Sequence, residues 1–112
     1  MSKPALRPYS EYSLNALAFL GQLVREARIG KSMTAVDLAA RAGISRSLLH
    51  RIERGDPSCS IGAVFEAAAI CGVPLFEADQ RLMAQQLARQ TEKMVLLPKA
   101  VRPNLKAVSD DF

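Results

Sequence analysis

Four polar side chains on one predicted helix, residues 46–54, have the types and spacing for chemistry. Arg46, Ser47, His50 and Arg51 stand at positions i, i+1, i+4 and i+5, which share one face of a helix. An arginine fork can donate two parallel hydrogen bonds to paired acceptors such as O6 and N7 of guanine. A lone histidine on such a face is more often a contact than a general base. The pattern therefore indicates recognition of a nucleic acid.

The rest of the sequence offers no catalytic set. It has one histidine, no glycine-rich phosphate loop and no Ser/His/Asp or Cys/His combination. Cys59 and Cys71 form no CxxC pair and have no histidine at ligand spacing. We expect Cys71 in the core, Cys59 in a loop, and a reducing cytoplasm as the compartment. The sequence predicts no enzyme, no metal site and no cofactor.

The elements that must position the polar face form a helix-turn-helix over residues 34–55. Thr34 is a good N-cap for a first helix, and Gly43 suits a left-handed residue at its end. Ser45 caps the second helix, in which Leu48, Leu49 and Ile52 form the apolar stripe. Gly55 then ends that helix. Such a unit places its second helix in the DNA major groove.

Short polar groups near the helix N-termini are candidates for holding DNA phosphates. Such groups position a protein on the duplex without specifying sequence. The candidates are Lys31, Ser32, Thr34, Ser45 and Ser58. Asp56, just past the second helix, would repel phosphate, and we expect it to point away.

The composition fits one small helical domain with flexible ends. The chain has 112 residues, 49% of them hydrophobic, and six aromatic residues. Residues 1–80 hold nine of the 15 Lys and Arg and eight of the 11 Asp and Glu, so residues 81–112 carry +3 of the net charge of +4. No segment approaches the roughly 20 apolar residues that span a bilayer, so no membrane partner is expected.

Three further helices complete an all-α bundle of about five helices. The first should cover residues 14–29, burying Leu17, Leu20, Leu23, Val24 and Ala27. Ser60 should cap the fourth, with Ile61, Val64, Phe65, Ala68 and Cys71 inward and Gly72 at its end. The fifth should cover residues 75–94, with Phe76, Leu82, Met83, Leu87 and Met94 on its apolar side. We thus expect an N-terminal arm (1–12), a DNA-binding domain (13–95) and a flexible basic tail (96–112).

The segment LAARAGISRSLLHRIERG, residues 38–55, resembles the Cro/CI-type (XRE) helix-turn-helix family. The resemblance covers roughly residues 20–75 and implies a lambda-repressor-like fold that binds double-stranded operator DNA as a homodimer. It places the base-reading positions on Arg46, Ser47 and Arg51. It also implies an ion pair between Arg28 and Glu53 close to the DNA backbone, with Arg28 able to touch phosphate.

Ala35 departs from the family pattern, which usually has a glutamine there whose side chain helps to fix the DNA backbone. This departure removes one expected polar contact. The fifth helix is longer than a minimal core needs, and its surplus could pack on a second copy or simply cap the core.

The run ERGDPSCSIG and the ending LPKAVRPNLKAVSDDF resemble HipB-type antitoxins, which accompany HipA-type serine/threonine kinase toxins. This resemblance implies a repressor of its own operon that also binds and neutralises such a kinase. The tail, with Phe112 as an aromatic anchor, would then order on the partner. The candidate partner-binding residues are Lys99, Arg102, Lys106 and Phe112.

Other functions remain open beside the antitoxin. One is a stand-alone Cro/CI-type repressor whose tail only adds nonspecific DNA affinity. A weaker one is a fold that has lost DNA binding and only mediates protein contacts. The arginines of the polar face argue against a loss of DNA binding.

Overall fold

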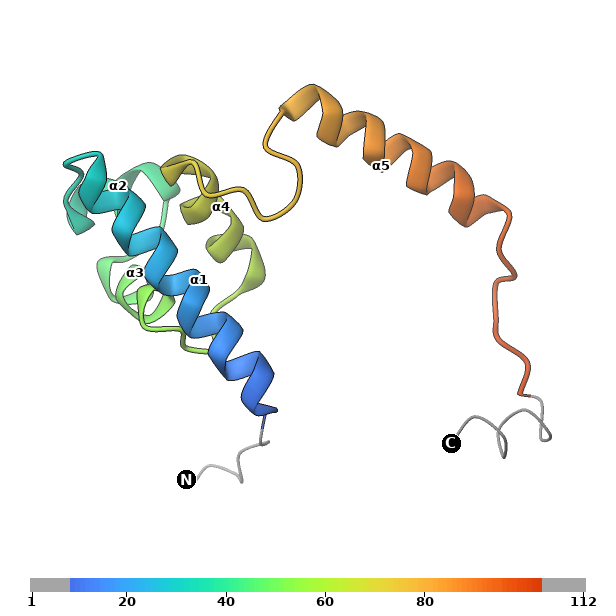
Figure 1. Cartoon of the computed structure of the whole chain (residues 1–112), viewed down its shortest axis with the longest axis horizontal. Coiled ribbons are helices and arrows are strands. Elements are labelled where there is room, and N and C mark those ends of the chain that lie inside the picture. Colours follow the sequence, from blue (N-terminus) through green and yellow to red (C-terminus); the bar gives the residue numbers. More distant parts are fainter. Residues whose placement is uncertain (1–8, 104–112) are drawn as a thin grey trace. The chain divides into compact units, whose positions relative to one another are not determined.

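The computed structural model describes residues 9–103 and contains five helices and no strand within that range (Figure 1). The all-α fold class with a helix-turn-helix is therefore confirmed. The helices are α1 (Glu11–Gly30), α2 (Ala35–Ala42), α3 (Arg46–Glu53), α4 (Ile61–Cys71) and α5 (Gln80–Val95). The chain divides into two units between Ala78 and Asp79, so the predicted domain 13–95 runs across this division.

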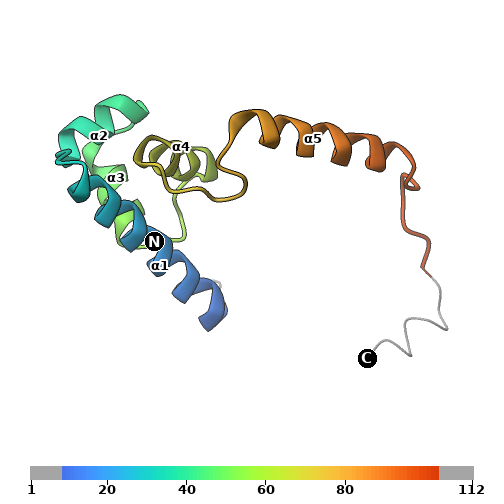
Figure 2. The same cartoon turned by 45° about the horizontal axis from the view of Figure 1, so that its top comes forward.

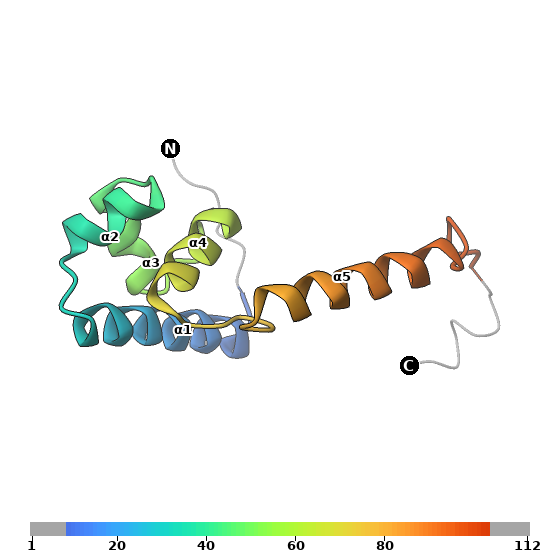
Figure 3. The ribbon, with the colours of Figure 1, turned by 90° about the horizontal axis from the view of Figure 1, so that it is seen from above.

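The first unit is built from α1 to α4. Both α1 and α2 pack against α3 and α4, and Figure 3 shows the three shorter helices on one side of α1. The buried core joins Val24 of α1, Leu38 of α2, Leu49 of α3 and Ala68 of α4. The first unit thus holds the helix-turn-helix between a long helix and a short one.

The predicted caps of the helix-turn-helix and of α4 are confirmed. Thr34, Ser45 and Ser60 each accept a hydrogen bond from a backbone N–H in the first turn of the helix that they precede. Gly43, Gly55 and Gly72 all have left-handed backbone angles just past a helix. These signals are local in sequence, because a cap needs only its own helix terminus.

The predicted start of α1 was wrong by three residues. Ser10 accepts a hydrogen bond from the Ser13 N–H at 3.1 Å, so the helix begins at Glu11 and includes Tyr12. An acidic residue in the first turn favours this earlier start. The inward face also differs: Val24 is buried, whereas Leu17 and Leu23 are only partly buried.

The prediction that Ile61 and Phe65 are buried was also wrong. Ile61 is 73% exposed and Phe65 is 38% exposed, while Ala67, Ala68 and Cys71 are the buried residues of α4. The small alanine side chains allow a close approach to the neighbouring helices, and the larger side chains lie on the outer face. Phe65 instead stacks on Phe76, with ring centroids 6.1 Å apart.

The second unit contains α5, which begins later than predicted (Figure 2). The Asp79 carboxylate accepts hydrogen bonds from the N–H groups of Arg81 and Leu82, at 2.8 and 3.2 Å, and fixes the start at Gln80. Residues 75–79 are irregular, so Phe76 precedes the helix. The other predicted apolar residues, Leu82, Met83, Leu87 and Met94, lie on α5.

Candidate nucleic-acid interface

The polar face of α3 forms an open hollow on the surface of the first unit. It is lined by Ser45, Arg46, Ser47, His50, Arg51 and Arg54. The structure thus brings together Arg46, Ser47, His50 and Arg51, the four side chains predicted to share one face of this helix. Leu49 and Ile52 are buried on the other side of α3 and hold this face outward.

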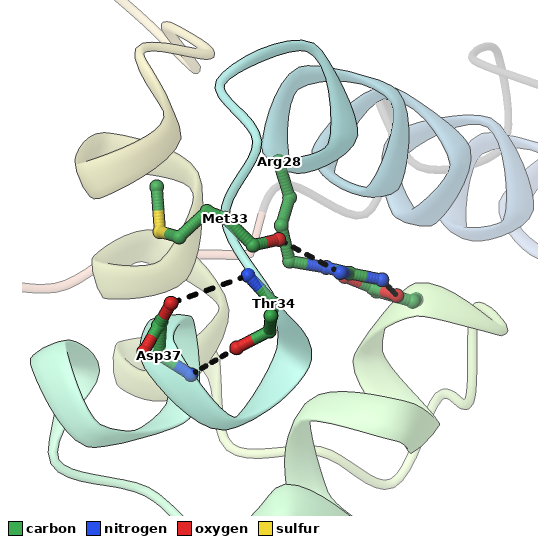
Figure 4. Close-up of polar contacts among 5 residues, drawn as sticks. Arg28, Met33, Thr34 and Asp37 are labelled. Atoms are coloured by element: carbon green, nitrogen blue, oxygen red, sulfur yellow. Dashed lines mark hydrogen bonds and ion pairs between the residues drawn. The ribbon is translucent and has the colours of Figure 1, made fainter.

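The hydroxyl groups of Ser45, which lines the hollow, and of Thr34, which caps α2, each keep a proton that can be donated to phosphate. The Leu48 N–H donates to Ser45 Oγ at 3.0 Å, and the Asp37 N–H donates to Thr34 Oγ1 at 3.0 Å. Figure 4 shows the reciprocal bond from the Thr34 N–H to the Asp37 carboxylate, which completes a capping box. A hydroxyl that accepts in this way still has its own O–H to donate.

Ser58, another predicted hydroxyl contact, donates its hydroxyl proton within the protein. Its N–H and its hydroxyl both donate to Asp56 Oδ1 at 2.8 Å. These two hydrogen bonds are the main reason why the pKa of Asp56 is lowered, with smaller contributions from Arg51 and Arg54. The Asp56 carboxylate lies 4.0 Å from Arg51 Nη1, and Asp56 is not among the residues that line the hollow.

The ion pair expected between Arg28 and Glu53 is confirmed. Arg28 Nε and Nη2 donate to the two carboxylate oxygens at 2.8 and 3.1 Å, and Nη1 donates to the Met33 carbonyl at 3.0 Å (Figure 4). The side chains of Arg28 and Glu53 are only 12% and 7% exposed. The hydrogen bonds to Glu53 raise the pKa of Arg28 despite the opposing effect of burial. Each of the three guanidinium nitrogens is thus used within the protein.

Lys31 and Ser32, the remaining phosphate candidates, lie in the turn between α1 and α2. Both are exposed, and Ser32 has a left-handed φ of 56°. The end of the Lys31 side chain passes over Gly72, where α4 ends, with Nζ 3.9 Å from the position that a Cβ would take there. A cation at this point interacts favourably with the negative end of the α4 dipole.

Two glycines on which the site depends were given no packing role by the sequence. A Cβ on Gly21 would lie 2.6 Å from the carbonyl oxygens of Ile52 and Glu53, so α1 approaches the end of α3 too closely for any side chain. A Cβ on Gly55 would lie 2.7 Å from Cα of Ala18. A single glycine inside an otherwise apolar helix was the available signal for Gly21.

The predicted partner-binding residues fall in the last part of the chain. Lys99 and Arg102 are exposed in the irregular segment after α5. Lys106 and Phe112 lie outside the residues that the structure describes.

The described part of the chain shows neither a metal-binding cluster nor a membrane-spanning helix. Between residues 9 and 103, no three His, Cys, Asp or Glu side chains are grouped so that they could hold a metal ion. No helix in this range is both long and apolar enough to cross a membrane.

Comparison with known families agrees with this geometry. The model of a helix-turn-helix domain family matches residues 20–82, which is more than half of the chain. The match begins within α1, includes α2, α3 and α4, and ends just after the start of α5. No curated protein matches the chain.

Proposed function

The chain belongs to the helix-turn-helix domain family, and from this premise we propose that it is a transcriptional regulator that binds operator DNA sequence-specifically. The observation that carries the proposal is the outward polar face of α3, on which two arginines, a serine and a histidine line one hollow. A helix presented in this way fits the major groove, where donor and acceptor patterns differ between base pairs.

The side chains divide into two proposed roles. Arg46, Ser47, His50 and Arg51 contact base edges, with the arginines supplying most of the discrimination. The hydroxyl groups of Thr34 and Ser45 and the side chains of Lys31 and Ser32 hold the phosphates. Ser58 was also a phosphate candidate, but its hydroxyl proton is donated to Asp56. Arg28 acts mainly through Glu53, by fixing α1 against α3, because its guanidinium already donates three hydrogen bonds within the protein.

Selection of binding sites from a random DNA library tests this proposal. Arg46→Ala and Arg51→Ala should each weaken binding to the selected site about 5- to 100-fold. Arg25→Ala is the matched control, because Arg25 is an exposed arginine of α1 outside the proposed interface. Unchanged affinity in both α3 variants would reject the assigned face.

We also propose that the protein binds DNA as a homodimer through α5. Met83, Leu87 and Met94 recur at intervals of four and seven residues, as in the seam between two packed helices. Leu87→Glu should shift the sedimentation of the protein from dimer to monomer. Gln85→Glu adds the same charge on the opposite side of α5 and should leave the dimer intact.

A finer proposal is that the regulator is an antitoxin that neutralises a HipA-type kinase and represses its own operon at the bacterial nucleoid. It is supported by the resemblance of residues 53–62 and of the tail to HipB-type antitoxins. Removal of residues 98–112 should weaken kinase binding without changing the melting of the first unit. A pull-down that recovers operator DNA but no kinase would favour the alternative, a stand-alone repressor.

A further inference from the structure

The end of α3 places Asp56 directly against Arg51. Gly55 has a left-handed φ of 81°, the Gly55 N–H donates to the Ile52 carbonyl at 3.0 Å, and the Asp56 N–H donates to the Arg51 carbonyl at 3.0 Å. These two bonds define a Schellman motif. In this motif the residue after the glycine returns to the last turn of the helix, so Asp56 meets the residue five positions before it.

Two other helices of the same unit end with the same motif but with a different side chain after the glycine. Ile44 follows Gly43 and donates its N–H to the Ala39 carbonyl at 3.0 Å, and Val73 follows Gly72 and donates to the Ala68 carbonyl at 2.8 Å. Both side chains pack against the core, which is the usual apolar contact of this motif. Only at the end of α3 does a carboxylate take this place among these three helix ends.

The carboxylate is itself held in position. Its Oδ1 accepts two hydrogen bonds from Ser58, and its Oδ2 lies 4.0 Å from Arg51 Nη1. The helix-ending motif, Ser58 and Asp56 thus lead to Arg51, which is the member of this arrangement that lines the hollow.

We infer that Asp56 is a positioning residue for Arg51, which holds the guanidinium at the α3 face so that it meets a base edge and not a phosphate. This inference rests on the proposed function. A long arginine side chain has many rotamers, and a fixed neighbouring carboxylate reduces the number that it must lose on binding. The same negative charge repels phosphate, so Asp56 lowers nonspecific affinity while it favours the specific complex.

Asp56 could act by positioning Arg51 or only by repelling phosphate. The ratio of the affinities for the selected site and for a scrambled duplex distinguishes these two effects. Asp56→Asn in the full chain should raise affinity for the scrambled duplex and lower the ratio about two- to fivefold, as expected for an exposed pair. Glu66→Gln, on the exposed surface of α4, makes the same change in charge away from Arg51 and should leave the ratio unchanged. If Asp56→Asn strengthens both complexes equally, Asp56 only repels DNA and the inference is overturned.

Two further variants keep the inference testable. In an Arg51→Ala background, Asp56→Asn should no longer alter the ratio, and a persisting effect would show that Asp56 does not act through Arg51. Ser58→Ala removes one of the two hydrogen bonds to the carboxylate and should lower the ratio by less than Asp56→Asn does. Matching thermal melting curves of these variants would exclude a folding defect.

The same selection of DNA sites distinguishes a failure of the proposed function from a failure of the positioning role of Asp56. A wild-type protein that selects no sequence would reject the proposed function, and the positioning role with it. A wild-type protein that selects a site, beside an Asp56→Asn variant with an unchanged ratio, would reject the positioning role alone.

Discussion

Arg28–Glu53 and Arg51–Asp56, two arginine–carboxylate pairs among the described residues of the first unit, have the same chemistry but different surroundings. Arg28 and Glu53 join α1 to α3 with two hydrogen bonds and are largely buried, whereas Arg51 and Asp56 lie at 4.0 Å with 39% and 28% of their side chains exposed. A buried pair that loses one partner leaves an uncompensated charge, and an exposed pair is screened by water. The first pair therefore fixes α1 against α3, and the second contributes little to stability and stays accessible at the surface.

The largest expected effect comes from breaking the buried pair. Arg28→Ala leaves the Glu53 carboxylate buried without its guanidinium and should lower the free energy of unfolding by about 3 kcal/mol. Urea denaturation followed by circular dichroism measures this loss. Replacing both partners, as Arg28→Met with Glu53→Leu, should recover part of the stability, because the double variant buries no charge. A loss below about 0.5 kcal/mol for Arg28→Ala would show that the pair behaves like a surface pair.

The next largest loss of stability should come from a side chain at Gly21, where α1 and α3 approach each other closely. Gly21→Ala would force a Cβ against the carbonyl oxygens of Ile52 and Glu53 and should destabilise the fold by about 2 kcal/mol. The same denaturation experiment on Gly62→Ala provides the control, because a Cβ there meets nothing within 4 Å. That variant should gain about 0.5 kcal/mol from the higher helix propensity of alanine. Equal effects of the two substitutions would contradict the close contact between α1 and α3.

A smaller effect on stability is expected when Arg51, the arginine of the exposed pair, is replaced. Arg51→Ala should change the free energy of unfolding by less than about 1 kcal/mol. Its main effect should be on DNA, where base preference is lost at one position while the salt dependence of affinity keeps its slope. A slope lower by about one would instead assign Arg51 to a phosphate. Titration of binding against salt concentration distinguishes these outcomes.

The smallest expected effect is the lowered pKa of Asp56, the carboxylate of the exposed pair. Because the folded protein lowers the pKa of Asp56, its carboxyl should titrate below the ordinary value of 3.8. The stability that Asp56 contributes is thus present above pH 3.8 and is lost as the pH falls through the lowered pKa. Nuclear magnetic resonance of the carboxyl carbon measures the midpoint. Ser58→Ala removes the hydroxyl hydrogen bond but keeps the one from the Ser58 N–H, so it should move the midpoint part of the way back toward 3.8. A midpoint that does not move would exclude a contribution from the Ser58 hydroxyl.

The sequence predicted the local parts of the site well. Thr34, Gly43, Ser45 and Gly55 mark the ends of α2 and α3 because each cap depends on a few neighbouring residues. The spacing of Leu49 and Ile52 then placed the polar residues of α3 on the outward face. The pairing of Arg28 with Glu53, 25 residues apart, came from the family resemblance and not from any local pattern.

Other features were not predicted, either because they depend on which helices meet or because two local signals compete. Phe65 has the spacing of a core residue, yet the alanines of α4 occupy the core and leave it on the outer face. The start of α5 was placed too early because the apolar residues of 75–79 continue the pattern, while the Asp79 cap decides the boundary. The sequence predicted that Asp56 repels phosphate and points away, but it did not predict the return of the chain at Gly55, which brings Asp56 within 4.0 Å of Arg51.

By itself, therefore, the sequence determined where the helices of the helix-turn-helix begin and end and which side of α3 is polar, because caps and helical periodicity act within a few residues. Only the tertiary structure decided that Gly21 must be a glycine and that Arg28 and Glu53 are buried together. These two features depend on the distance and angle between helices that are far apart in the sequence. Packing sets that geometry, and no short pattern of residues encodes it.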